Sequence, residues 1–153
     1  MLKKDNGITL IALGSAIIIM IIIFSITIIS ATDILRNTQV NRLRVNLRLI
    51  KTQAATMFED YMFDGTDNLG SKATTAEIQA VGWKEIEGVE YRIWDMEKVN
   101  SLGIDLKKSQ SSEKFIIQLN TKTNEVDVAS TKGYSDGKGN NYYSLNSLKN
   151  FEE

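Results

Sequence analysis

The feature that most constrains this chain is an uncharged run from Ile8 to Ile29, which contains 22 residues. At a rise of about 1.5 Å per residue, a helix of this length extends for roughly 33 Å, enough to cross the hydrocarbon core of a bilayer. A cleavable secretory signal is the alternative, but its apolar core is usually about 7–15 residues long and ends in a small-x-small site. Because the chain continues into more helix, the run predicts a transmembrane segment.

The helix is expected to continue past the apolar run, because the chain has no proline and no glycine between Gly14 and Gly65. Gly65 is expected to cap a spine of roughly 55 residues. Apolar residues repeat along the extension at alternating intervals of three and four, which predicts one buried face. These residues are Val40, Leu43, Leu47, Ile50, Ala54, Met57 and Tyr61. The face could be a coiled-coil seam between two chains or the surface on which the chain's own head folds, and the second interpretation is favoured.

Composition restricts the chemistry of the chain, which has no cysteine and no histidine. Disulfides and thiolate metal sites are therefore excluded, and the commonest general base and metal ligand are missing. Residues 36–63 contain five basic and two acidic residues, a charge of +3, whereas residues 64–153 contain eleven basic and fifteen acidic residues, a charge of −4. The weak acidity of the head gives no nucleic-acid footprint. The sequence predicts a protein that is not an enzyme and that needs no cofactor.

The remaining residues predict a small α+β head. A loop from Asp64 to Thr75 carries oxygen donors at Asp64, Asp67 and Asn68, but not in the order of a calcium loop, so no metal site is predicted. Capping residues predict short helices after Thr74, Asp95 and Ser144. Alternating β-formers predict half-buried strands over Val89–Trp94, Lys114–Leu119 and Glu125–Ala129, with the last two forming a hairpin, and a further short strand at Tyr142–Tyr143. Residues 132–141 are rich in glycine and small polar residues and predict a loop.

Two groups of side chains in the head have a structural and a functional interpretation. The aromatic residues Trp83, Trp94, Tyr142 and Tyr143 are interpreted as packing residues rather than a binding platform. The carboxylates of Glu85, Glu87 and Glu90 are clustered, but a charge run of this kind is usually a solvated face. No nucleophile, acid and base can be assigned together.

The junction Lys3-Lys4 to Gly7-Ile8-Thr9-Leu10-Ile11-Ala12-Leu13 resembles the processing motif of type IV prepilins and pseudopilins, in particular pilin-like proteins of Gram-positive bacteria. The resemblance implies that a prepilin peptidase cuts after Gly7 and that Ile8 becomes an N-methylated terminus. It also implies a lollipop-shaped pilin fold. The expected segments are then a leader at residues 1–7, a transmembrane or filament-core helix at residues 8–30, its amphipathic soluble half at residues 31–63 and a globular head at residues 64–153.

The implied function is that of a structural subunit of a type IV pilus (a fimbrium) or of a pseudopilus of the type II secretion or competence kind. Its partners would be membrane lipid, the peptidase and copies of itself or other pilin-like subunits. The resemblance places the N-terminus in the cytoplasm and the head outside the cell, on a single-pass anchor or in an extracellular filament. Ala12 stands where most pilins carry a glutamate, and the usual proline of the helix is missing, which favours a minor or atypical subunit. The alternative is an anchored extracellular binding protein that does not polymerise.

Overall fold

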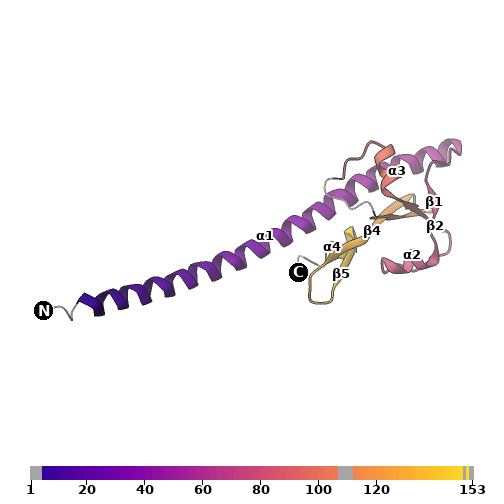
Figure 1. The fold of residues 1–153 in the computed structure, drawn as a ribbon. Helices are drawn as coiled ribbons and strands as arrows, with labels where there is room; N and C mark the ends of the chain where they lie inside the picture. Colours follow the sequence, from indigo (N-terminus) through magenta and orange to yellow (C-terminus); the bar gives the residue numbers. More distant parts are fainter. Residues whose placement is uncertain (1–4, 107–111, 150, 152–153) are drawn as a thin grey trace. The chain divides into compact units, whose positions relative to one another are not determined.

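The structure is a computed structural model that describes residues 5–106, 112–149 and 151. Within its first helix, the side chains of residues 5–12 and 26–33 lie outside that description. The chain forms two compact units, Met1–Thr38 and Gln39–Glu153. Helix α1 (Asp5–Asp64) contributes to both units, and all the strands belong to the second unit (Figure 1).

Helix α1 contains 60 residues and ends where the sequence predicts. Gly65 adopts a φ of 78°, and its N–H donates to the carbonyl oxygen of Tyr61 over 3.0 Å. This left-handed residue satisfies a carbonyl that the helix itself leaves open, and glycine adopts that conformation without a steric penalty.

The structure contradicts the predicted membrane location. Among the residues that it describes, no helix combines the length and the apolarity that crossing a bilayer requires, which is about 20 consecutive apolar residues. The prediction of a single-pass anchor with a cytoplasmic N-terminus and an extracellular head is therefore wrong, and so is that of a transmembrane half of the spine.

The predicted apolar face of α1 packs against the sheet of its own chain. Val40, Leu43, Leu47, Ile50 and Ala54 are buried in one cluster with residues of the strands, and Met57 and Tyr61 pack against the edge of that cluster. The interpretation as a surface for the chain's own head is confirmed. The pattern missed Phe58, which is only 2% exposed, because the alternation of intervals continued from Ala54 to Met57, three positions on, and passed over the residue four positions on.

The sheet has five antiparallel strands in the order β1-β2-β3-β4-β5, so neighbours along the chain are also neighbours in the sheet. The α+β class and the antiparallel sheet are confirmed. The strands are β1 (Ser71–Lys72), β2 (Val89–Trp94), β3 (Phe115–Asn120), β4 (Glu125–Ser135) and β5 (Asn141–Ser144). No sequence pattern indicates β1, which has two residues and lies in the predicted loop.

The prediction of strands with one solvated face is wrong for the centre of the sheet, because a second cluster covers the other face. Ile78 and Val81, from helix α2 (Thr75–Ala80) and its end, pack there against Tyr91, Ile116 and Ala129. Adjacent residues of β3, such as Ile116 and Ile117, are therefore both buried, although they point to opposite faces.

Local capping signals place the short helices as predicted. Thr74 and Glu77 form a reciprocal capping box at the start of α2. The Asp95 carboxylate accepts from the N–H of Lys98 over 2.8 Å and caps α3 (Met96–Ser101). The Ser144 hydroxyl accepts from the N–H of Ser147 over 3.3 Å at the start of α4 (Leu145–Lys149).

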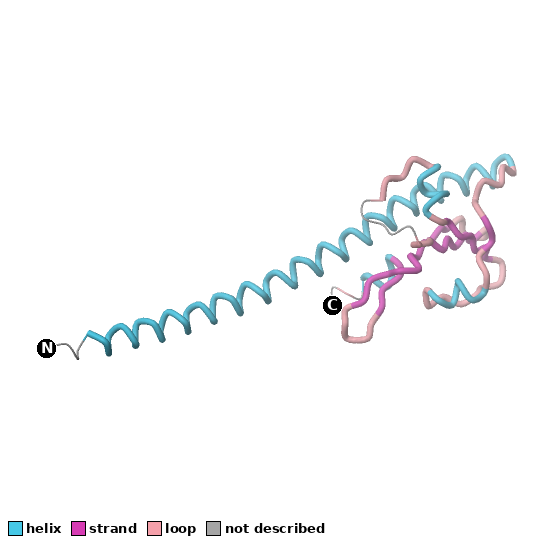
Figure 2. The backbone as a smooth tube through the Cα atoms, in the orientation of Figure 1, coloured by secondary structure: helices cyan, strands magenta, loops and turns pink. Residues whose placement is uncertain are grey.

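The predicted loop at residues 132–141 is shorter in the structure, because β4 continues to Ser135 before it turns into β5 (Figure 2). The register of the two strands shifts between Ala129 and Tyr134, at a bulge that contains Gly133. A Cβ on Gly133 would lie 2.6 Å from a ring carbon of Tyr143, and its φ is 59°. The glycine that suggested a loop therefore allows a strand to bend.

Candidate functional site

The residues of the predicted processing site lie in the first unit, on α1. Gly7, Ile8, Thr9, Leu10, Ile11 and Ala12 are helical, but their side chains lie outside the described residues. Leu13 is the one residue of the motif whose side chain is described, and it is 61% exposed. Cleavage behind Gly7 and methylation of Ile8 remain predictions from the sequence.

An apolar surface follows directly on α1. The residues from Leu13 to Phe24 include no charged side chain, and the large apolar residues among them are each 50–65% exposed. We call Leu13–Phe24 the apolar segment. These large residues are Leu13, Ile17, Ile18, Ile19, Met20, Ile21, Ile22, Ile23 and Phe24. Monomeric proteins rarely expose so many contiguous apolar groups, and such surfaces usually mark a site of association.

The second unit has a basic hollow of about 400 Å³ between α1 and α4. Its cationic residues are Arg44, Arg48 and Lys51 from α1 and Lys149 from α4, and Leu145 and Asn146 complete the lining. The spacing from Arg44 to Arg48 to Lys51 places these three residues on one helix face. Asp127 lies nearby and forms an ion pair with Lys51 at 3.7 Å. The sequence showed the excess of basic residues but not the contribution of Lys149, which depends on the packing of α4.

The C-terminal end of α1 combines an apolar surface with negative charge. Phe63 is 94% exposed and Met62 is 50% exposed, beside a hollow of about 330 Å³ that Glu59 also lines. Asp64 accepts hydrogen bonds from the side chain and the N–H of Thr66, and these bonds lower the pKa of Asp64. The last turn of α1 contains no basic residue. The negative end of the helix dipole is therefore not balanced by a cation in that turn.

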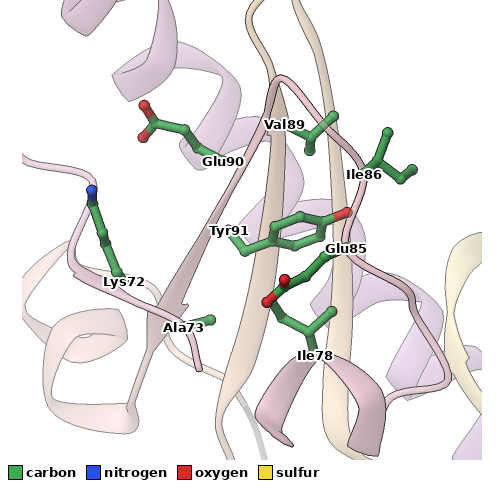
Figure 3. Close-up of a pocket in the computed structure, with 8 residues that line it drawn as sticks. All are labelled: Lys72, Ala73, Ile78, Glu85, Ile86, Val89, Glu90 and Tyr91. Atoms are coloured by element: carbon green, nitrogen blue, oxygen red, sulfur yellow. The ribbon is translucent and has the colours of Figure 1, made fainter. Parts of the chain in front are cut away.

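A third hollow, of about 270 Å³, lies between α2 and β2 (Figure 3). The Tyr91 ring forms its floor, and burial raises the pKa of Tyr91, whose hydroxyl donates to the carbonyl oxygen of Lys84 over 3.0 Å. Glu85 lies beside this ring and accepts from the Thr75 hydroxyl over 2.7 Å, whereas the carboxylate of Glu90 points away (Figure 3). The two carboxylates therefore do not face a common substrate position.

The carboxylates of the loop after α1 also have partners within the chain. Arg92, which the strand pattern placed on a solvated face, has a side chain only 7% exposed and forms ion pairs with Glu90 at 3.0 Å and Asp67 at 3.2 Å. Arg92 also donates to the carbonyl oxygen of Gly70 over 3.0 Å. These bonds tie the loop to β2. Among the described residues, no group of three or more acidic side chains could hold a metal ion.

The predicted packing aromatics do pack. Trp94 is fully buried and donates from Nε1 to the carbonyl oxygen of Leu69 over 2.7 Å, and Trp83 lies 6.5 Å from the Tyr91 ring, centroid to centroid. Tyr142 contacts Phe151 edge-to-face at 5.3 Å between centroids, and Tyr143 packs against the second cluster. None of the four forms an open stacking platform.

No protein-family model, no curated protein and no solved structure matches this chain.

Proposed function

We propose that this chain is a structural subunit that polymerises through its N-terminal helix, of the type IV pilin and pseudopilin class, and that it serves as a minor or atypical subunit. A prepilin peptidase removes the leader behind Gly7, and Ile8 becomes the N-terminus of the mature chain. The partners of the mature chain are copies of itself or related subunits. The proposal rests on the motif from Gly7 to Leu13 and on the surface that follows it.

The observation that carries the proposal is the exposure of the apolar segment. Full burial of an isoleucine or leucine side chain contributes about 1.5–3 kcal/mol, so nine half-exposed apolar residues represent a large driving force for association. No charged residue interrupts Leu13–Phe24, so helices can pack on any side without burying a charge. The simplest partner that would bury these apolar side chains is the same segment of another copy.

The burial of the amphipathic part of α1 also supports this function. Its apolar face is already buried against the sheet of its own chain, with Leu47 and Ile50 fully buried. That face is therefore not available as a seam between two chains. The chain thus has a self-contained head and, on the same helix, an apolar surface that the head does not need for its core.

The processing step is tested by the intact mass and N-terminal sequence of the protein from its own cells. We expect a chain that begins at Ile8 and carries one additional methyl group. A mature chain that still begins at Met1 or Leu2 would contradict the proposal.

The association step is tested by replacing one exposed isoleucine in the apolar segment. Ile18→Asn changes a residue that is 60% exposed, and Ile34→Asn is the matched control, because Ile34 is 65% exposed but lies outside the segment. We expect Ile18→Asn to prevent pelleting of polymers and Ile34→Asn to have little effect. If Ile18→Asn still forms polymers that pellet as well as those of Ile34→Asn, the segment does not hold copies together.

A further inference from the structure

The second unit exposes two surfaces of opposite charge that lie on the same helix. We call the first the basic surface, made of Arg44, Arg48, Lys51 and Lys149 with Leu145 and Asn146. We call the second the acidic end, made of Glu59, Asp60, Met62, Phe63 and Asp64 at the end of α1. Arg48, Lys149, Glu59, Asp60, Phe63 and Asp64 are all exposed. The charged side chains of both surfaces lie outside the two buried clusters, whereas Leu145 of the basic surface packs against the first cluster.

We propose that the acidic end of one copy docks on the basic surface of the next copy, with Phe63 placed in the basic hollow. This inference rests on the proposed function, because it assigns the contact between the heads of neighbouring subunits. Opposite charges on the two surfaces favour this pairing over a contact between two identical surfaces.

Three features of the acidic end suit a cationic partner. The helix dipole adds negative partial charge at the end of α1, and no basic residue in the last turn offsets it. Hydrogen bonds from the side chain and the N–H of Thr66 hold the Asp64 carboxylate in place and lower its pKa. The Phe63 ring, 94% exposed, offers a face on which an arginine or lysine can stack.

The basic surface supplies the complementary shape and chemistry. Its hollow of about 400 Å³ is large enough for an aromatic side chain, and its lining combines the long side chains of Arg48 and Lys149 with the apolar Leu145. Lys51 already pairs with Asp127 at 3.7 Å, and Arg44 donates to the Asn41 side-chain oxygen over 2.9 Å. Arg48 and Lys149 are therefore the cations that the docking mainly uses.

The two surfaces cannot pair within one chain. From Arg48 to Phe63 there are fifteen residues of continuous helix, which separates them by about 22 Å along the axis of α1. A contact between two different surfaces of identical chains is heterologous, so each copy still offers one free surface of each kind. Such contacts form rings or open helical polymers, and the second outcome is the one that a filament requires.

The docking is tested by charge reversal in the full chain, with polymer formation measured by pelleting at 0.05 M and 1 M salt. Asp60→Lys and Arg48→Glu should each raise the concentration needed for pelleting about tenfold at low salt, with a smaller effect at 1 M, where the Debye length is about 3 Å. The chain with both changes should regain pelleting to within about threefold of the original, because the two surfaces then exchange signs.

Two matched controls change the net charge equally at exposed positions elsewhere on the head. Glu87→Lys matches Asp60→Lys, and Lys138→Glu matches Arg48→Glu. Phe63→Ser removes the ring without changing the charge and should weaken pelleting at both salt concentrations. Urea unfolding of each variant shows whether the head is still folded, and we expect unchanged midpoints because all these side chains are exposed.

The same assay separates the docking from the proposed polymerisation. If Ile18→Asn abolishes pelleting while Asp60→Lys and Arg48→Glu behave like their controls, the docking is wrong and the helix-based polymer stands. If the charge reversals weaken pelleting and the double variant restores it while Ile18→Asn has no effect, the docking stands and the helix-based polymer is wrong. If the original chain never pellets, both are wrong.

Discussion

Replacing Leu47 by alanine tests how α1 divides its residues between the core and the surface, because Leu49 two positions away provides a matched control. Leu47 is fully buried, whereas Leu49 is 47% exposed. Leu47→Ala removes three buried carbon atoms, worth about 2.4 kcal/mol, and leaves a cavity that brings the loss to about 3–4 kcal/mol. Leu49→Ala loses about half of the transfer term and leaves no enclosed cavity, so we expect a loss of about 1 kcal/mol or less.

Urea unfolding followed by tryptophan fluorescence measures both losses, because the fully buried Trp94 reports on the same cluster that contains Leu47. With a denaturant slope of about 1.5 kcal/mol/M, the midpoint should fall by about 2 M for Leu47→Ala and by well under 1 M for Leu49→Ala. Equal shifts for the two variants would refute the assignment of the helix faces. A difference between the original and Leu47→Ala midpoints that changes with protein concentration would show instead that Leu47 packs between chains.

Two further changes test the loop and the cap that precede β2. Gly70→Ala should lower the melting temperature more than Gly103→Ala does. Both residues have positive φ, but of the two only Gly70 has other atoms close to the new Cβ, which would lie 2.8 Å from the Trp94 ring. Equal losses in melting temperature would contradict this prediction. Glu77→Gln should flatten the fall in stability below about pH 5, measured as urea midpoints at pH 7 and pH 3. The Thr74 N–H and hydroxyl lower the pKa of Glu77, so the unfolded chain binds more protons than the folded one. The stability that Glu77 contributes is therefore complete above its unfolded pKa and is lost as the pH falls through the lower folded pKa. If the fall in stability is the same in Glu77→Gln as in the original chain, this role is refuted.

Local signals in the sequence were sufficient for most of the elements. The capping residues Thr74 and Asp95 and the terminal Gly65 act within a few positions of themselves, so their effect can be read without knowledge of the fold. The periodicity of α1 identified its buried face for the same reason. The α+β fold class and the positions of most strands follow from such local signals.

The errors came from contacts between residues far apart in the chain. Arg92 was placed in solvent because its neighbours alternate, but Asp67 and the carbonyl of Gly70, more than twenty residues earlier, surround it. The second face of the sheet was predicted to be open because nothing in β3 indicates that α2 covers it. Lys149 joined the basic surface only through the fold of α4. Each case required a packing partner that periodicity does not specify.

The membrane prediction failed for a different reason, since it depended on one property, the length of an uncharged run. Among the described residues no helix meets the requirement for crossing a bilayer, yet the large side chains from Leu13 to Phe24 are still exposed and apolar. The apolar face of α1 from Val40 to Phe58 is buried within the head, so it is not available to bind another chain. A large exposed apolar surface either binds a partner or leads to aggregation at high protein concentration. The proposed assembly uses this segment and the oppositely charged surfaces of the head, and it requires no change in the core.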